Sequence, residues 1–259
     1  MKKIIKYGLF TISSILIFII LLFVTDTVID HSLYSLKIND FKAKCTLVKE
    51  TADVKYYSYK KEGEVPGYYS TGSTLYPGNY GDVIVSPNAT LVDPKVYASE
   101  FINGFISYFA GGHAAFVTKE FNDYSEHFSN RDSIEATGME GGLNPSKKAN
   151  RAYWIDDGTY KEVVGLRMNG ITDEQKDELM SIIYGELGDY YNFSFGLFES
   201  KSKSYCSDLI SKAYNRIGYD LNKDKFFTTI YDLVVSPDCY ISYYHYFDSD
   251  GVKYVYYIE

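Results

Sequence analysis

Two residues that can carry nucleophilic catalysis stand out in this chain, a cysteine at position 206 and a histidine at position 113. Cys206 follows the polar run 201–204 and opens a stretch of apolar residues with helical spacing. A helix start with lysines nearby stabilises a thiolate, the nucleophilic form of cysteine. First-turn N–H groups could also bind a developing oxyanion. A small buried cysteine that packs beside Leu209 fits this position equally well.

His113 is the natural partner for such a thiol. It begins a short apolar strand directly after Gly111 and Gly112, and glycines let a backbone or a substrate approach closely, so Gly112 is predicted to border the substrate. An imidazole can take the thiol proton and return it to a leaving group near neutral pH. A purely structural histidine is the ordinary alternative. The remaining histidines compete less well by position: His31, His127 and His245.

Glu135 lies in a further predicted strand, residues 133–137. A carboxylate on a strand beside His113 could accept a hydrogen bond from the second imidazole nitrogen and fix the tautomer. A solvent-facing strand acid is the alternative. Tyr205, next to the cysteine, is predicted to touch substrate, although simple packing would also explain it.

The elements that must position these residues are short strands and amphipathic helices. Strands are predicted over 83–85, 113–117, 133–137 and 162–168, and 240–247 with 252–258 form a hairpin. Helices are predicted over 95–108, from Thr172 to about Gly185, and from Cys206 to Gly218 with Ser204 as N-cap. This pattern predicts an α+β domain in which an antiparallel sheet packs against helices.

The N-terminus carries a nearly uninterrupted apolar run over residues 7–24, preceded by lysines at positions 2, 3 and 6. The run has about the length that crosses a bilayer, ~17–25 residues, and no small-residue cleavage site follows it. We therefore expect a single-pass anchor in the cell membrane. Its positive flank predicts that everything after Val24 is extracytoplasmic. The predicted division is an anchor (1–28), a connector (29–74) and a catalytic domain (75–259).

Composition narrows the function classes. A formal net charge of −8 argues against nucleic acid as a partner, because phosphate binding needs a basic stripe. Three cysteines are too few for a disulfide framework, although Cys45 and Cys239 could pair outside the cell. Four histidines and no C-x-x-C spacing predict no metal site, and no cofactor is expected.

Four short motifs follow one another in a fixed order: Gly81–Val85, Gly112–Ala114, Ile134–Ala136 and Tyr205–Ile210. This order resembles the YiiX/YebB-like branch of the NlpC-type cysteine hydrolases, whose papain-like fold is circularly permuted. In that branch the histidine strand and the carboxylate precede the cysteine helix, as they do here. The resemblance covers roughly residues 75–240.

The resemblance implies that Cys206 is the nucleophile, His113 the base and Glu135 the third member of the site. The chain departs from the pattern at Asp208, where glutamate is common. Polar insertions between residues 122 and 154 also bear on the identity of the third member.

The resemblance further implies hydrolysis of an amide or peptide bond through an acyl-enzyme, with cell-wall peptide as a natural target outside a bacterial membrane. A lipid-directed acyl hydrolase or acyltransferase is the alternative, because the same permuted fold resembles the lecithin retinol acyltransferase group. A non-catalytic wall-binding module is a third hypothesis. The joint presence of Cys206, His113 and Glu135 counts against it.

Overall fold

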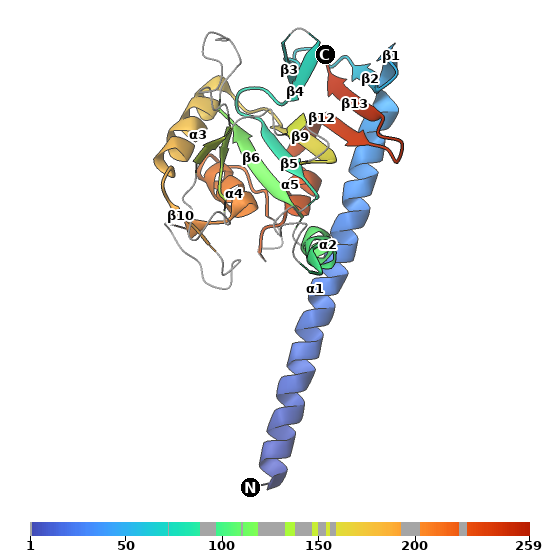
Figure 1. The fold of residues 1–259 in the computed structure, drawn as a ribbon. Coiled ribbons are helices and arrows are strands. Elements are labelled where there is room, and N and C mark those ends of the chain that lie inside the picture. The colour runs from blue at the N-terminus through green and yellow to red at the C-terminus, as the bar shows by residue number, and fades with distance from the viewer. Residues whose placement is uncertain are drawn as a thin grey trace.

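One large sheet forms the centre of the molecule (Figure 1). The computed structural model describes residues 2–71, 73–88, 97–109, 111–118, 133–137, 147–149, 154–155, 159–192, 203–222 and 227–259. Within these ranges the sheet has nine strands, in the spatial order β1-β2-β13-β12-β9-β5-β6-β7-β8. Their bounds are β1 Thr46–Glu50, β2 Val54–Tyr59, β5 Val83–Ser86, β6 His113–Val117, β7 Ser133–Glu135, β8 Lys147–Ala149, β9 Glu162–Met168, β12 Cys239–Phe247 and β13 Lys253–Ile258. Neighbouring strands are antiparallel except β13 and β2, which run parallel.

The centre of the sheet is buried on both faces. In β5, Val83 and Val85 join the main core with the helices, whereas Ile84 points to a second cluster that contains Trp154 and Tyr160. This split follows from the two-residue repeat of a strand, which sends successive side chains to opposite faces. A β-branched run without polar interruption therefore suits this central position.

Among the described residues, three helices lie between β9 and β12 in the chain: α3 (Asp173–Gly185), α4 (Cys206–Arg216) and α5 (Ile230–Val235). The predicted start of α3 is confirmed, because the Thr172 side chain accepts a hydrogen bond from the Gln175 backbone while the Gln175 side chain binds Thr172 in return. The predicted end of α4 is also confirmed, since Gly218 has a positive φ of 96°.

The predicted N-cap of α4 is wrong. Tyr205, in an extended conformation, occupies the cap position, and its side chain makes no capping hydrogen bond. Ser204 lies one residue earlier, in the short strand β11 (Lys203–Ser204), which pairs in parallel with β10 (Tyr190–Tyr191). Because Ser204 pairs within this two-stranded ladder, the N-cap position falls on the next residue, Tyr205.

The predicted helix over 95–108 is observed as α2 (Ser99–Phe109), between β5 and β6; residues 95 and 96 lie outside the described residues. The strands predicted over 83–85, 113–117 and 162–168 are confirmed, as is the C-terminal hairpin.

The N-terminal helix α1 is much longer than its apolar run and spans Lys2–Lys44. Its far half packs against α5 and β12, and the buried residues recur every three or four positions: Thr27, Asp30, Tyr34, Ile38 and Phe41. This repeat is the helical stripe expected where a helix covers a core. The preceding part of α1 projects away from the rest of the chain (Figure 1), with its apolar side chains from Phe10 to Leu22 exposed.

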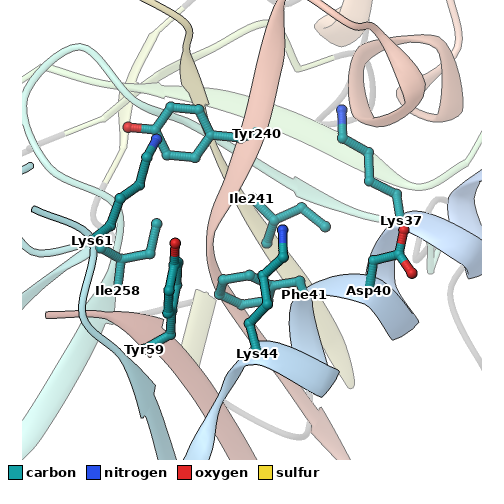
Figure 2. A pocket seen from close by; sticks show the side chains of 9 residues that line it. All are labelled: Lys37, Asp40, Phe41, Lys44, Tyr59, Lys61, Tyr240, Ile241 and Ile258. Atoms are coloured by element: carbon teal, nitrogen blue, oxygen red, sulfur yellow. The ribbon is translucent and has the colours of Figure 1, made fainter.

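A polar clamp also holds α1 to the domain. The Lys37 ammonium donates hydrogen bonds to the backbone oxygens of Ser236 at 2.7 Å and Cys239 at 2.8 Å. Beside this clamp, α1, β2 and β12 enclose a cavity of about 290 Å³ (Figure 2), which includes none of the predicted catalytic residues. The position of α1 on the domain is therefore fixed by both packing and hydrogen bonds.

The segment predicted as a connector contains regular structure. It holds the last part of α1, the strands β1 and β2, and β3 (Tyr68–Thr71), which pairs with β4 (Thr74–Pro77) across the predicted boundary. Because β2 pairs with the C-terminal strand β13, the sheet draws on both sides of the predicted boundary at residue 75. The division into domains stays a prediction.

A buried ion pair ties this segment to the sheet. Arg167 of β9 donates to both carboxylate oxygens of Asp82, each at 2.8 Å, and also to the backbone oxygens of Val65 and Pro66. The Asp82 charge raises the pKa of Arg167 further, although burial alone would lower that pKa. Asp82, which belongs to the first of the four motifs, thus has a structural partner.

Candidate active site

Cys206 is the first residue of α4 and is half-buried. The first backbone hydrogen bond of the helix runs from the Leu209 N–H to the Tyr205 oxygen at 2.9 Å. The N–H groups of residues 206–208 therefore precede the helical ladder, at the positive end of the helix dipole. This is where the sequence predicted the thiol, and the N–H groups of the first turn point toward the same end of the helix.

His113 is the first residue of β6, and its ring lies against both other predicted members of the site. The Nε2 atom contacts the Glu135 carboxylate oxygen Oε2 in a hydrogen bond, and the ring also has a side-chain hydrogen-bonding contact with Cys206. Because Glu135 occupies Nε2, the nitrogen left for the thiol is Nδ1. The structure thus brings Cys206, His113 and Glu135 together, although His113 and Cys206 are 93 positions apart in the sequence.

The pairing of β6 with β7 explains why Glu135 reaches the imidazole. Phe116 lies opposite Ile134 and Val117 opposite Ser133, so the same register sets Glu135 opposite Ala115. His113 is two residues from Ala115 on the same face of the sheet. Diagonal neighbours of this kind are within reach of long side chains.

The environment of His113 favours its charged form. Burial alone lowers the pKa of the imidazole, but Tyr160, Glu135 and Cys206 together raise it well above its usual value. Tyr160 is itself a neutral phenol near pH 7, because burial raises its pKa. The Glu135 carboxylate and the hydrogen-bonding contact with Cys206 are therefore what stabilises an imidazolium at neutral pH.

An aromatic stack covers the imidazole. The ring centroids of His113 and Trp154 lie 5.6 Å apart with an interplanar angle of 14°, and Trp154 stacks on Tyr160 at 4.4 Å. Such faces attract a cationic ring, exclude water and restrict its rotation. Sequence reasoning missed both residues. The only available signal was that Trp154 is the single tryptophan of the chain.

Tyr205 does not point its hydroxyl toward open space. The side chain is 4% exposed, and the hydroxyl accepts a hydrogen bond from the Thr228 backbone N–H at 2.7 Å. The Ser207 hydroxyl donates to the Thr228 backbone oxygen at 2.8 Å. Tyr205 and Ser207, the two neighbours of Cys206, therefore hold the backbone of Thr228, just before α5. The hydrogen bond of the Tyr205 hydroxyl favours a packing role for this residue over substrate contact.

The glycines before His113 are held closely. The Gly112 N–H donates to the Ser86 oxygen at 3.0 Å, which continues the pairing of β5 with β6. Gly111 has a φ of 78°, and a Cβ atom there would stand 2.0 Å from Ile230 Cγ1 of α5. Any side chain at position 111 would collide with Ile230, so glycine is required there. The absence of a side chain lets α5 pack against the start of β6.

The cysteines differ in their surroundings. All three are free thiols, so Cys45 and Cys239 do not form a disulfide in this structure. Burial raises the pKa of each of these two thiols to about 11. Among the described residues, no group of three or more histidine, cysteine, aspartate or glutamate side chains is arranged to hold a metal ion.

A thiol at a helix start, a buried imidazole and a carboxylate on the next strand have the composition of a cysteine-hydrolase site. The chain belongs to the permuted papain-like amidase enzymes of the YaeF/YiiX, C92 family, whose sequence profile matches residues 104–243, more than half of the chain. Membership of this family implies amidase or cysteine-hydrolase activity. The match contains Cys206, His113 and Glu135, whereas the motif at Gly81–Val85 lies before it. A comparison with curated proteins found no match.

Proposed function

We propose that the protein is a membrane-anchored cysteine amidase or peptidase in which Cys206 is the nucleophile, His113 the general acid and base, and Glu135 the residue that orients the imidazole. One observation carries this proposal. The half-buried His113 ring contacts the Cys206 thiol while its Nε2 atom is hydrogen-bonded to Glu135. Membership of the permuted papain-like amidase family supports the same assignment. The finer placement, in the YebB-like branch of the NlpC-type enzymes, is part of the proposal.

The chemistry starts from a thiolate and an imidazolium. The Cys206 sulfur attacks the carbonyl carbon of an amide, and the carbonyl electrons move onto oxygen to give a tetrahedral intermediate. His113 then donates its Nδ1 proton to the amide nitrogen, the C–N bond breaks, and the amine leaves an acyl thioester behind. In the second half, His113 takes a proton from water, the hydroxide attacks the thioester, and the thiolate is released with the acid.

Two features support this reaction: donors for the oxyanion and a carboxylate beside the imidazolium. The N–H groups of the first α4 turn lie beside the attacking sulfur and precede the helical ladder. Donors at this position can bind the oxyanion as it forms. Glu135 stabilises the imidazolium, so the ion pair is favoured before substrate arrives.

The proposed location is the cell membrane, with the catalytic domain outside the cytoplasm. Within the described residues, α1 is the one helix long and apolar enough to cross a membrane. The lysines at its start support the orientation by the positive-inside rule.

Cell-wall peptide is the proposed substrate class, because it is rich in amide bonds outside that membrane. A lipid-directed acyl hydrolase or acyltransferase is the second candidate. It is favoured by the direct packing of α1 on the catalytic domain, which would hold the site near acyl chains. Release of free amines from wall peptides without release of fatty acid from phospholipid would support the first candidate. The opposite result would support the second.

The replacement Cys206→Ala tests the nucleophile. We expect it to abolish turnover and leave the thermal unfolding temperature nearly unchanged, because the thiol is half-buried and small. Cys45→Ala is the matched control, since Cys45 is also half-buried but its thiol has a raised pKa. Full activity in the Cys206 variant would contradict the proposal.

Labelling gives a test that needs no substrate. A thiolate reacts with an electrophilic probe, whereas a protonated thiol does not. At pH 7 the probe should therefore modify Cys206 and largely spare Cys45 and Cys239, whose pKa values lie near 11. Preferential labelling of either of those two would count against Cys206 as nucleophile.

A further inference from the structure

Helix α2 turns its large apolar side chains away from the protein. Phe101 and Phe105 are 76% and 57% exposed, and Tyr108 and Ile102 are 42% and 38% exposed, whereas Ser99 is buried. Their spacing puts positions 101, 105 and 108 on one side of the helix. A helix on a water-facing surface shows the reverse arrangement, with its apolar side inward.

The exposed face of α2 is large for a protein surface. A full aromatic side chain contributes about 150–250 Å², so these four residues expose on the order of 400 Å². Contiguous apolar patches of this size usually mark a surface that something else covers.

The position of α2 beside α1 indicates what covers it. The ring of Phe109, the last residue of α2, stacks on Phe23 of α1 with centroids 5.2 Å apart. One residue earlier, the Tyr108 backbone oxygen lies 2.6 Å from His31 Nε2, and the two rings stack at 4.6 Å. The C-terminal end of α2 therefore lies level with residues 23–31 of α1.

This level is where the apolar run of α1 ends. Residues 7–24 span roughly 27 Å at the rise of an α-helix, close to the hydrocarbon thickness of a bilayer. If α1 crosses the membrane with this run, one membrane–water interface coincides with the α2 contact. Figure 1 shows α1 lengthwise and α2 nearly along its own axis, so α2 lies across α1, in the plane of that interface.

Aromatic residues gather at the same level. Phe23 contacts both Phe109 and Phe227, and the His31 ring packs against Tyr108 and Tyr231. Aromatic side chains are enriched where a membrane protein meets the headgroup region. The exposed apolar side chains of α2 thus lie next to the end of the exposed apolar run of α1, and lipid is the occupant that would cover both.

We infer that α2 is a second membrane contact, an interfacial helix whose exposed face enters the bilayer that α1 crosses and seats the catalytic domain on its surface. This inference rests on the proposed anchoring by α1. The buried stripe of α1 and the Lys37 hydrogen bonds fix the domain against the anchor, so the contact is a rigid one.

The contact has a consequence for the substrate. Phe109 and His113 are four positions apart in the sequence, so their Cα atoms are at most about 14 Å apart. The Cys206–His113 pair is therefore held close to the lipid surface. Amide or acyl substrates that are attached to the membrane are within its reach.

Tryptophan scanning of the full-length chain in lipid vesicles tests the contact. The chain has a single tryptophan, Trp154, which is 1% exposed and serves as an internal background. The reporter is Phe105→Trp, with Tyr108→Trp as a second reporter on the same face. Fluorescence is compared between vesicles of ordinary lipid and vesicles of lipid brominated near the headgroup end of the acyl chains, because bromine quenches indole only at short range.

Two further positions make the result decisive. Phe18→Trp, 61% exposed on α1, reports the anchor itself, and Leu47→Trp, 50% exposed on β1, is the matched control at the opposite end of α1. We expect brominated lipid to remove most of the added fluorescence at positions 18, 105 and 108 and none at position 47.

Each other outcome has a defined meaning. Quenching at position 18 without quenching at 105 and 108 overturns the α2 contact and leaves the anchor intact; a protein partner would then be the occupant of the patch. Absence of quenching at position 18 overturns the anchor and the inference together. Equal quenching at position 47 overturns the inference as well, because the lipid contact would then not be specific to α2.

Discussion

The replacement Glu135→Gln changes one charge beside the proposed catalytic histidine and leaves the size of the side chain nearly the same. Glutamine can still accept a hydrogen bond from His113 Nε2, so the tautomer of the ring is retained. The variant therefore isolates the electrostatic contribution of the carboxylate to the imidazolium.

The expected size follows from the contact between the two groups. A carboxylate and an imidazolium about 4 Å apart attract by about 4 kcal/mol at an effective dielectric constant of about 20. Opposite charges at such distances shift a pKa by about 1–3 pH units in proteins. The side chains of His113 and Glu135 are only 14% and 11% exposed, so water screens the pair little. We expect the pKa of His113 to fall in the variant, because the carboxylate that raises it is gone.

The sign of the effect on activity is fixed by the mechanism. The active form carries a proton on His113, and Glu135 holds the pKa of that group above its usual value. Loss of the carboxylate lowers this pKa, so the alkaline limb of kcat/KM against pH moves down by about 1–2 pH units. The difference from the wild type grows above the new limb and reaches about 10–100-fold above the wild-type limb, because the protonated form of His113 is then depleted by that factor. His113→Ala should cost more, about 10²–10⁴-fold, because it removes the proton-transfer group itself.

The assay combines kcat/KM between pH 5 and 10 with an NMR titration of the histidine rings, in which the His113 signal is assigned by its loss in His113→Ala. The titration needs no substrate. Glu178→Gln is the matched control, since Glu178 is an exposed glutamate of α3. An unmoved alkaline limb in Glu135→Gln would refute the assigned role. A shift in Glu140→Gln instead would make that residue, which lies outside the described residues, the third member of the site.

Two further predictions concern stability. Asp82→Asn should lower the free energy of unfolding by about 3–5 kcal/mol, because it leaves the buried Arg167 charge without its bidentate partner. The unfolding temperature of the detergent-solubilised chain measures this loss, with Glu64→Gln, at a half-exposed position, as the control. A smaller fall in Asp82→Asn than in Glu64→Gln would contradict the prediction. Burial, reinforced by the Lys253 charge, lowers the pKa of His245 well below its usual value. Below about pH 6.5 His245 is therefore protonated in the unfolded chain but stays neutral in the folded chain. The free energy of unfolding then decreases as the pH falls, by up to about 1.4 kcal/mol per pH unit. His245→Phe should remove that part of the acid slope, measured as the difference in unfolding temperature from the wild type between pH 7 and 5, and parallel curves would refute it.

The sequence predicted the local elements of this protein well, because those elements are encoded by short-range patterns. The β-branched run at Val83–Val85 and the apolar repeat after Cys206 have periods of two and about 3.6, which belong to a strand and a helix whatever surrounds them. The capping box at Thr172 is likewise complete within four residues. The predicted N-cap of α4 lies one residue too early, because Ser204 pairs within the β10–β11 ladder and Tyr205 caps the helix.

The catalytic candidates were predictable for a related reason. Cys206 owes its chemical suitability to a helix start, and His113 to the beginning of a strand, and both can be read from neighbouring residues. Their order along the chain then resembled a permuted papain-like site. The family match over residues 104–243 supports that resemblance, although it begins later than the predicted start at residue 75.

The remaining features depend on contacts between distant parts of the chain, and no local pattern encodes them. The stack of Trp154 and Tyr160 on His113, the hydrogen bond from Thr228 to the Tyr205 hydroxyl, and the parallel pairing of β2 with β13 all join segments whose spacing is arbitrary in sequence. By itself the sequence determined which residues could react and which stretch could cross a membrane. Only the tertiary structure decided that Glu135 reaches His113 and that α2 lies beside α1, because the first follows from the register of β6 with β7 and the second from how α1 packs on the domain.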